Sequence, residues 1–520
     1  MEWLPLFSFL EEEEWEWDIF YSRFFLMYIY LFIIGTCIGA LANYLADRLG
    51  WTPKFRSPWR RLPAEAAPLL PRRFIDYIPV LGWLSLRRWN DLLFPPATLF
   101  EPKRDRRRAS ENAARQKQLE TVRLLAKNPV PGLESRWFWL RPFLVECGLG
   151  IFLAWLYCWQ VDLDRMSLTQ LGFGFDMQDI LVRFLPLTTA GQSWIYAVYV
   201  FLFVLLLTSS LLDLDDYFIP DSLTILGTFG GLVLLTLIPM AVFTPFLWFA
   251  PTEDGILEPM TDVVRYFGLI GSESLLARYF PLIVMLFCWL FWCFAVLDRR
   301  WYTKYGTKKA LALFVHRLRR SPVTRVILIL CPIGIAGICW IYFANPSWQL
   351  TPPLPPDESS LETIPDTVTV WNCQLSPRSA LFNALVGMVV GMVLIWSVRI
   401  VGHWALGVEA MGFGDVMLMA TIGTFISWQG SLVAFFLAPF AGLVFGVIRL
   451  LCGMQKEIPY GPFLCLGTVV WLVCRTTFWN MFEPFMKDPI LVLMVMVPCL
   501  ILLGVLLKLW RMIRKLIFGF

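Results

Sequence analysis

The sequence is poor in residues that many soluble enzymes use for catalysis and solubility. Only two of its 520 residues are histidines, and charged residues make up 16%, against about 25% in an ordinary globular protein. No Gly-x-Ser-x-Gly segment occurs, so the turn that presents the serine of α/β-hydrolases is missing. Hydrophobic residues make up 58%, which excludes a disordered chain and a soluble enzyme of usual composition.

Cysteines are present, but their spacing does not suit a metal site. Of the twelve, eleven lie in or at the ends of apolar segments, and only Cys373 lies in a polar connection. No pair shows the Cys-x-x-Cys spacing of a zinc site, and the two histidines, His316 and His403, lie on different connections. We therefore predict small buried thiols and no zinc.

Long apolar runs dominate the chain. Several reach about 20 residues, the length that spans a bilayer as a helix. The segment at 416–429 is shorter and is expected to tilt or to line a cavity. We predict an all-α polytopic membrane protein with about eleven transmembrane helices, near residues 24–45, 143–160, 194–212, 222–245, 280–297, 326–344, 379–400, 416–429, 431–451, 461–480 and 489–508.

Basic residues gather in alternate connections. The block 46–141 holds 20 of the 44 Lys and Arg residues and the connection 298–325 holds nine, whereas 161–193, 246–279 and 345–378 hold five together. Because basic connections stay in the cytoplasm, the N-terminus is predicted outside and the C-terminus cytoplasmic. The block 46–141 then forms a cytoplasmic domain after the first helix. Its Arg-rich stretch has no interleaved aromatic residues, which favours anionic lipid heads over nucleic acid as its neighbour.

Acidic residues mark two places where predicted helices end. The first, SSLLDLDDYFIPDSLTILG, holds Asp213, Asp215, Asp216 and Asp221 without a nearby basic residue. Four carboxylates beside a bilayer are costly unless some are protonated or lie in water. Pro220 marks a turn, after which Asp221 is predicted to cap the next helix.

The second acidic place is GVEAMGFGDVMLMATIG, which holds Glu409 and Asp415. Gly412 and Gly414 come shortly before Asp415, and glycines permit close backbone approach. The predicted topology puts Asp415 on the same membrane face as Asp213, although 202 positions separate them.

Two aspartates at one depth fit three interpretations. In a catalytic dyad, repulsion keeps one carboxyl protonated and the other ionised, so that one deprotonates water while the other donates to a scissile carbonyl, as in aspartic proteases. The pair can equally be helix caps with acidic neighbours, or part of an ion or proton pathway. Spacing alone leaves all three open.

At these residues the sequence resembles the type IV prepilin leader peptidases, membrane aspartic peptidases of the GxGD kind. In DLDDYFIPDSLT, Asp213 and the later triplet 219–221 fit the family's first motif. GVEAMGFGDVMLMA fits the second, with Ala410 where the family prefers Gly and Met417 where it prefers Lys. Further resembling segments follow the family's order: GTCIGALANYLADRL at 35–49, FIDYIPVLGWLSLR at 74–87, RPFLVECGLGIF at 141–152 and EIPYGPFLCLG at 457–467.

The chain departs from the family pattern in several places. The family's two Cys-x-x-Cys pairs are missing, and a charged stretch is inserted at 90–134. Residues 246–378 are an insertion that adds two spans and a basic loop, and the last span, 489–508, is also additional. Because the insertion adds two spans, Asp213 and Asp415 stay on one membrane face.

The resemblance implies that Asp213 and Asp415 are the catalytic pair. The other candidates would shape the site or contact substrate: Asp215, Asp221, Glu409, Gly412 and Gly414. It implies an endopeptidase that removes the basic leader of type IV prepilins or pseudopilins at the cytoplasmic face of the bacterial inner membrane, beside pilus or type II secretion machinery, without a cofactor. Many members also N-methylate the new terminus with S-adenosylmethionine. Because the cysteine pairs are missing here, retention of that activity stays open.

The predicted organisation has seven parts. These are an acidic external N-terminus (1–23), the first transmembrane helix (24–45), the basic cytoplasmic domain (46–141), a membrane region with the first aspartate (142–245), the insertion (246–378), a membrane region with the GxGD motif (379–480), and an added helix with a basic tail (481–520). Two alternatives remain, a catalytically divergent scaffold for secretion or pilus assembly, and a transporter.

Overall fold

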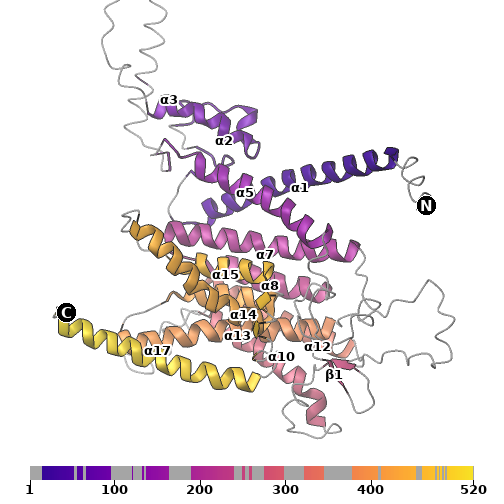
Figure 1. Ribbon diagram of the computed structural model, residues 1–520, viewed down its shortest axis with the longest axis vertical. Helices are drawn as coiled ribbons and strands as arrows, with labels where there is room; N and C mark the ends of the chain where they lie inside the picture. The colour runs from indigo at the N-terminus through magenta and orange to yellow at the C-terminus, as the bar shows by residue number, and fades with distance from the viewer. Residues whose placement is uncertain are drawn as a thin grey trace, which may run out of the picture. The chain divides into compact units, whose positions relative to one another are not determined.

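The computed structural model describes most of the helical parts of the chain. The described residues are 14–51, 55–62, 66–94, 120, 132–133, 136–162, 189–238, 249–251, 257–259, 275–297, 321–344, 377–407, 411–451, 459–474, 477–478, 481–482, 485 and 489–518. The chain divides into two compact units, unit 1 (Met1–Asp164) and unit 2 (Arg165–Phe520), whose helices are labelled in Figure 1.

Unit 1 is built on two apolar helices that cross closely, α1 (Glu14–Leu49) and α5 (Leu140–Tyr157), the latter extended by the π-helical turn η4 (Cys158–Asp162) (Figure 1). Glycines at the crossing let the backbones approach. A Cβ atom on Gly35 would lie 2.7 Å from Cα of Gly150, and one on Gly39 would lie 2.7 Å from Cα of Glu146. Small residues four apart commonly bring two membrane helices together in this way.

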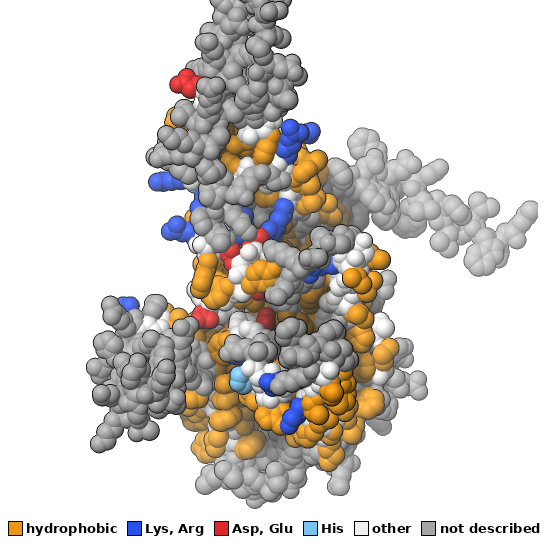
Figure 2. Space-filling model, turned by 90° about the vertical axis from the view of Figure 1, so that its left-hand side faces the viewer, with side chains coloured by type: hydrophobic (Ala, Val, Ile, Leu, Met, Phe, Trp, Pro, Cys, Tyr) orange, Lys and Arg blue, Asp and Glu red, His pale blue; other side chains and the backbone are white. Residues whose placement is uncertain are grey.

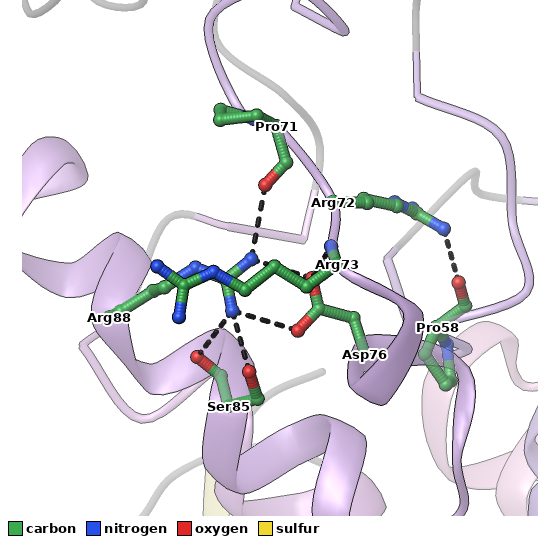
Figure 3. Close-up of polar contacts among 7 residues, drawn as sticks. All are labelled: Pro58, Pro71, Arg72, Arg73, Asp76, Ser85 and Arg88. Atoms are coloured by element: carbon green, nitrogen blue, oxygen red, sulfur yellow. Dashed lines mark hydrogen bonds and ion pairs between the residues drawn. The ribbon is translucent and has the colours of Figure 1, made fainter.

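The polar part of unit 1 is a small folded domain. It contains η1 (Phe74–Tyr77), α2 (Leu81–Leu86), η2 (Arg87–Trp89) and α3 (Asn90–Leu93) around a mainly aromatic core. The fully buried Asp76 accepts hydrogen bonds from both terminal nitrogens of Arg88, at 2.8 and 2.6 Å, and from the backbone N–H of Arg73 at 2.7 Å (Figure 3). Arg88 also donates to Ser85 (Figure 3), so one ion pair fastens η1 to α2 and η2.

Glu146 joins this domain to the apolar helices of unit 1. Its fully buried carboxylate accepts hydrogen bonds from the backbone N–H of Val80 at 2.6 Å, from Nε1 of Trp83 at 2.8 Å and from Nδ2 of Asn43 at 3.3 Å. Val80 has a φ of 62°, which is strained for a β-branched residue. The strained turn is therefore held by a buried acceptor on α5.

Unit 2 contains the remaining helices. Beside one small antiparallel hairpin, β1 (Phe249–Pro251) with β2 (Leu257–Pro259), its described elements are α7 (Thr189–Asp216), α8 (Asp221–Leu237), α10 (Leu275–Val296), α12 (Pro322–Ala344), α13 (Pro377–Leu406), α14 (Phe413–Leu451), α15 (Gly461–Val473) and α17 (Pro489–Phe518). Within the described part of the chain, eight helices are long and apolar enough to cross a membrane, and α8 and α15 are shorter apolar helices. The protein is an all-α polytopic membrane protein.

Helix α14 reverses direction in its middle. Ser427 has φ 62° and ψ −178°, which are not helical angles. A Cβ atom on Gly423 would lie 2.9 Å from Oγ of Ser431, although eight residues of unbroken helix span about 12 Å. The two halves therefore run back along each other. The sequence predicted this break between the segments 416–429 and 431–451.

The helices of unit 2 pack around α13 and α14. These two make the most extensive helix pair, and α14 also contacts α8 and α15, while α15 contacts α7. Helices α10 and α17 pack on α13. Figure 2 shows orange apolar side chains over much of the described surface. On α17 the exposed apolar side chains include Leu493, Met494, Ile501 and Leu502. Such a surface suits helices that face lipid.

Every predicted apolar segment overlaps a described helix, and two of them fall on the two halves of α14. The ends differ by up to ten residues, as at the start of α1 and the end of α17. The number of crossings and the external N-terminus stay predictions. The boundary between the compact units falls after Asp164 and places α5 with α1, whereas the predicted division of the chain at residue 142 groups that helix with α7 and α8.

Candidate active site

Asp213 lies in the last turn of α7 and is only 6% exposed. Its Oδ2 accepts a hydrogen bond from the backbone N–H of Gly461, the first residue of α15, at 3.1 Å. The positive end of a helix dipole lies at that N–H and stabilises a negative charge. Just beyond Asp213, Tyr217 turns the chain with a φ of 53°, and its N–H donates to the Asp213 carbonyl at 3.0 Å.

Asp415 lies in the first turn of α14 and is 8% exposed. The backbone N–H of Gly412 donates to its carboxylate, and the Asp213 carboxylate is close enough to act on it electrostatically. The structure thus brings together the two aspartates that the sequence singled out, from helices that begin more than 200 positions apart.

The two sequence motifs also contact each other directly. A Cβ atom on Gly414 would lie 3.1 Å from Cβ of the buried Ile219, so a glycine lets the GxGD segment approach the turn that follows α7. Further along, Oγ1 of Thr421 on α14 lies 2.9 Å from Oγ1 of Thr228 and donates to the carbonyl of Thr224 on α8, at 3.2 Å. These contacts fix α14 beside α8 within unit 2.

The other predicted site residues have different surroundings. Asp215 follows Asp213 by two positions, which turns its side chain by about 200° on a helix, so the two carboxylates leave α7 on opposite sides. Asp215 is half-buried, Gly412 is exposed and Gly414 is half-buried. Glu409 lies outside the described residues.

Asp221 is half-buried at the start of α8. It begins the helix rather than capping it, because the cap position is held by Pro220. The prediction of an Asp221 cap was therefore wrong. Pro220 itself takes the cap position, so the helix begins one residue earlier than the sequence suggested. The Asp221 carboxylate therefore lies in the first helical turn.

The segment that begins α15 supplies residues that the sequence did not assign to the site. Gly461 binds Asp213, and Asp415 acts electrostatically on Tyr460. Burial and, after it, the Asp415 carboxylate raise the pKa of the Tyr460 phenol above its ordinary value. Cys465, one turn along α15, is buried within electrostatic range of both carboxylates. The only sequence signal was the resemblance of 457–467 to a family segment.

Two buried carboxylates that repel each other can share one proton. The ionised one can take a proton from water, and the protonated one can donate a hydrogen bond to a carbonyl oxygen. Backbone N–H groups at Gly461 and Gly412 hold the two side chains in place. Within the described residues no three His, Cys, Asp or Glu side chains come together as a metal site.

Residues 366–447 match the sequence profile described as the type IV leader peptidase family. This part of the chain, which includes the GxGD segment, is thus similar to the type IV leader peptidase family. The match contains Asp415 and most of α14, whereas Asp213 lies outside it. No solved structure matches the chain.

Curated proteins similar to this chain are named prepilin leader peptidase/N-methyltransferase. One from Burkholderia pseudomallei (strain K96243) is 27% identical over 115 residues, which are 22% of this chain and 36% of the relative. One from Stutzerimonas stutzeri is 36% identical over 100 residues, 18% of this chain and 34% of the relative. One from Pectobacterium carotovorum subsp. carotovorum is 30% identical over 122 residues, 21% of this chain and 43% of the relative. The chain thus spans less than half the length of these relatives.

Proposed function

We propose that this protein is a membrane-embedded aspartic endopeptidase that removes the basic leader from type IV prepilins or pseudopilins. The observation that carries the proposal is the convergence of Asp213, in the last turn of α7, and Asp415, in the first turn of α14. Both are buried and act on each other electrostatically. If the two aspartates served only as helix caps, their carboxylates would have no reason to lie close together. The similarity of residues 366–447 to the type IV leader peptidase family and the names of the relatives support the substrate class.

The proposed chemistry uses the two carboxylates and one water. The ionised aspartate takes a proton from the water, whose oxygen attacks the carbonyl carbon of the scissile peptide. The protonated aspartate donates to the carbonyl oxygen as the tetrahedral intermediate forms. Breakdown of the intermediate moves a proton to the amine of the leaving segment and restores the shared proton. Each aspartate acts as acid and base in turn.

The acidic surroundings suit a basic leader. Asp215, Asp216 and Asp221 follow Asp213 within eight positions, and opposite charges raise the local concentration of a charged substrate. We propose that Glu409 adds to this attraction. The proposed setting is the cytoplasmic face of the bacterial inner membrane, where pilus or type II secretion machinery would receive the product.

The proposed cleavage needs no cofactor, because the dyad activates water directly. Methylation with S-adenosylmethionine would require a site for a charged methionine end and a ribose. Buried polar atoms without a partner in the described part of unit 1 include Nε1 of Trp89, Oδ1 of Asn90 and Nε1 of Trp139, but both indoles belong to the apolar core. These atoms do not fit the cofactor.

The test is cleavage of a co-expressed prepilin with a basic leader, in membranes that contain wild type, Asp213→Asn, Asp415→Asn or Glu120→Gln, a change at an exposed carboxylate outside the site. We expect wild type and Glu120→Gln to cut, and both dyad variants to lose cleavage by a factor of at least about 10³. Mass spectrometry of the new N-terminus reports any added methyl group.

Other outcomes assign the chain to a different class. If folded wild type cuts no cognate prepilin, the peptidase proposal fails and the scaffold interpretation is favoured. If the dyad variants cut normally while an ion or proton gradient across the membrane changes, the transporter interpretation is favoured.

A further inference from the structure

The segment that leads into the GxGD motif begins where α13 ends. Helix α13 stops at Leu406, and Gly407 adopts a φ of 75°, with its N–H bonded to the carbonyl of His403 at 2.8 Å. Glycine in this left-handed conformation is a common helix stop. Asp415 follows eight positions later. We call residues 407–413 the lead-in segment, of which the structure describes Gly407 and residues 411–413.

Helix α17 contacts the lead-in segment at Gly407, where the segment begins. Nη1 of Arg511 donates to the carbonyl of Ala405 at 3.4 Å, and a Cβ atom on Gly407 would lie 3.1 and 3.2 Å from the two terminal nitrogens of the same guanidinium. Nζ of Lys508 lies 4.8 Å above the ring of Trp404. Cations near the last carbonyls of a helix stabilise that helix end.

Helix α10 lies in the insertion. It contacts α13, and α13 in turn contacts Phe413 at the other end of the lead-in segment. The ring of Phe291 on α10 lies 6.0 Å from Trp396 on α13, and Trp396 lies edge-on to Phe413 at 6.4 Å. The guanidinium of Arg399, also on α13, lies 5.6 Å above the same Phe413 ring. Phe413 is the variable residue of the GxGD motif, two positions before Asp415.

We propose that α10 and α17, the elements that this chain has in addition to the family pattern, position Asp415 by holding the two ends of the lead-in segment. Arg511 is then a positioning residue that acts through Gly407, and Phe291 is one that acts through Trp396 and Phe413. The proposal rests on the proposed function for its effect on cleavage. A displacement of about 1 Å at a reacting group lowers turnover by up to about a hundredfold, so a loose lead-in segment would lower kcat more than substrate affinity.

The experiment compares Arg511→Ala and Arg511→Lys with Arg514→Ala, a substitution at an exposed arginine one turn along α17. We expect Arg511→Ala to lower kcat for prepilin cleavage about ten- to a hundredfold while KM and the melting temperature change little. Lysine should restore part of the activity, because it keeps the charge but not the planar fork. Arg514→Ala should behave as wild type.

Two further measurements keep the proposal open to refutation. Hydrogen exchange of the amides in 407–415 should speed up in Arg511→Ala but not in Arg514→Ala, whether or not a prepilin is cut. Phe291→Leu should act like Arg511→Ala, whereas Phe294→Leu, the same change at a largely exposed ring of α10, should not.

The outcomes separate the two proposals. Absence of wild-type cleavage overturns the proposed function alone, because hydrogen exchange still tests the positioning. Wild-type cleavage with unchanged exchange and kcat in Arg511→Ala overturns the positioning alone. Equal losses in Arg511→Ala and Arg514→Ala, or a loss explained by a lower melting temperature, also overturn it.

Discussion

The backbone N–H of Gly461 lies 3.1 Å from Oδ2 of Asp213, and a Cβ atom on Gly461 would lie 2.5 Å from that same oxygen. The start of α15 therefore binds the first aspartate, and the carboxylate fits there because residue 461 has no Cβ atom. Because Pro462 follows directly, the first turn of α15 has a fixed φ at its second residue. The Asp213 carboxylate therefore accepts its hydrogen bond from a backbone N–H that is held in a rigid turn.

Gly461→Ala should displace the Asp213 carboxylate and lower prepilin cleavage about ten- to a hundredfold. The control is Gly446→Ala on α14, where an added Cβ meets no atom within 4 Å. Cleavage assays on matched amounts of folded protein measure the difference. Equal activity of the two variants would contradict a positioning role for Gly461.

Thr421→Val should weaken the contact between α8 and α14. The change keeps the shape of the side chain but removes the hydroxyl that lies 2.9 Å from Thr228 and 3.2 Å from the Thr224 carbonyl. Hydrogen bonds between membrane helices contribute on the order of 0.6 kcal/mol, and we expect a loss of about that size or up to roughly twice it.

Thermal unfolding in detergent measures this loss, and a double-mutant cycle with Thr228→Val isolates the pair. The control is Thr236→Val on α8, whose hydroxyl bonds only within its own helix, to the carbonyl of Leu232. A coupling energy near zero between positions 228 and 421 would show that the hydroxyl pair does not hold the helices together.

Much of the helical organisation of this chain was predictable from the sequence, because apolar runs of spanning length have few alternatives in a bilayer. Even the reversal near Ser427 was visible, since Gln429 and Gly430 interrupt the apolar run. The pairing of Asp213 with Asp415 was predicted from the shared membrane face and from the family motifs. Their electrostatic contact agrees with that prediction.

The contacts that hold the site could not be predicted in the same way. Gly461 acts through a backbone N–H, which every residue but proline possesses, so its identity carries no chemical signal. The contact of Arg511 with Gly407 depends on the register in which α17 packs along α13. Helix packing register follows from the shapes of many side chains together, and a single sequence does not specify it.

Glu146→Gln should destabilise the junction of unit 1. The amide has one acceptor oxygen in place of two, and its NH₂ group would face donors now bonded to the carboxylate, namely Val80, Trp83 and Asn43. A buried donor left without its partner costs about 1–3 kcal/mol.

Limited trypsin digestion in the folded state measures this effect, because Arg61 and Arg73 are exposed in the same domain. Cuts between residues 56 and 89 should become faster in Glu146→Gln. Leu144→Ala, a change at a largely exposed side chain of α5, should leave them unchanged. An unaltered digestion rate in Glu146→Gln would contradict the junction role.

The ion pair of Asp76 with Arg88 predicts a pH dependence. Burial by itself raises the pKa of Asp76, but the hydrogen bonds from Arg88, from the backbone of Arg73 and from Ser85 outweigh it, so the pKa lies below its ordinary value. A carboxyl with a lowered folded pKa stabilises the fold above its unfolded pKa, and that contribution disappears as the pH falls through the folded value.

Asp76→Asn should therefore lower the free energy of unfolding by about 2 kcal/mol near neutral pH. That is less than for a fully buried pair, because the Arg88 side chain is 26% exposed and solvent screens it. The difference from wild type should stay constant down to about pH 4, the ordinary range of an aspartate, and shrink below it. Thermal unfolding of both proteins across this range measures it, and a difference that does not change with pH would show that the charge on Asp76 contributes nothing.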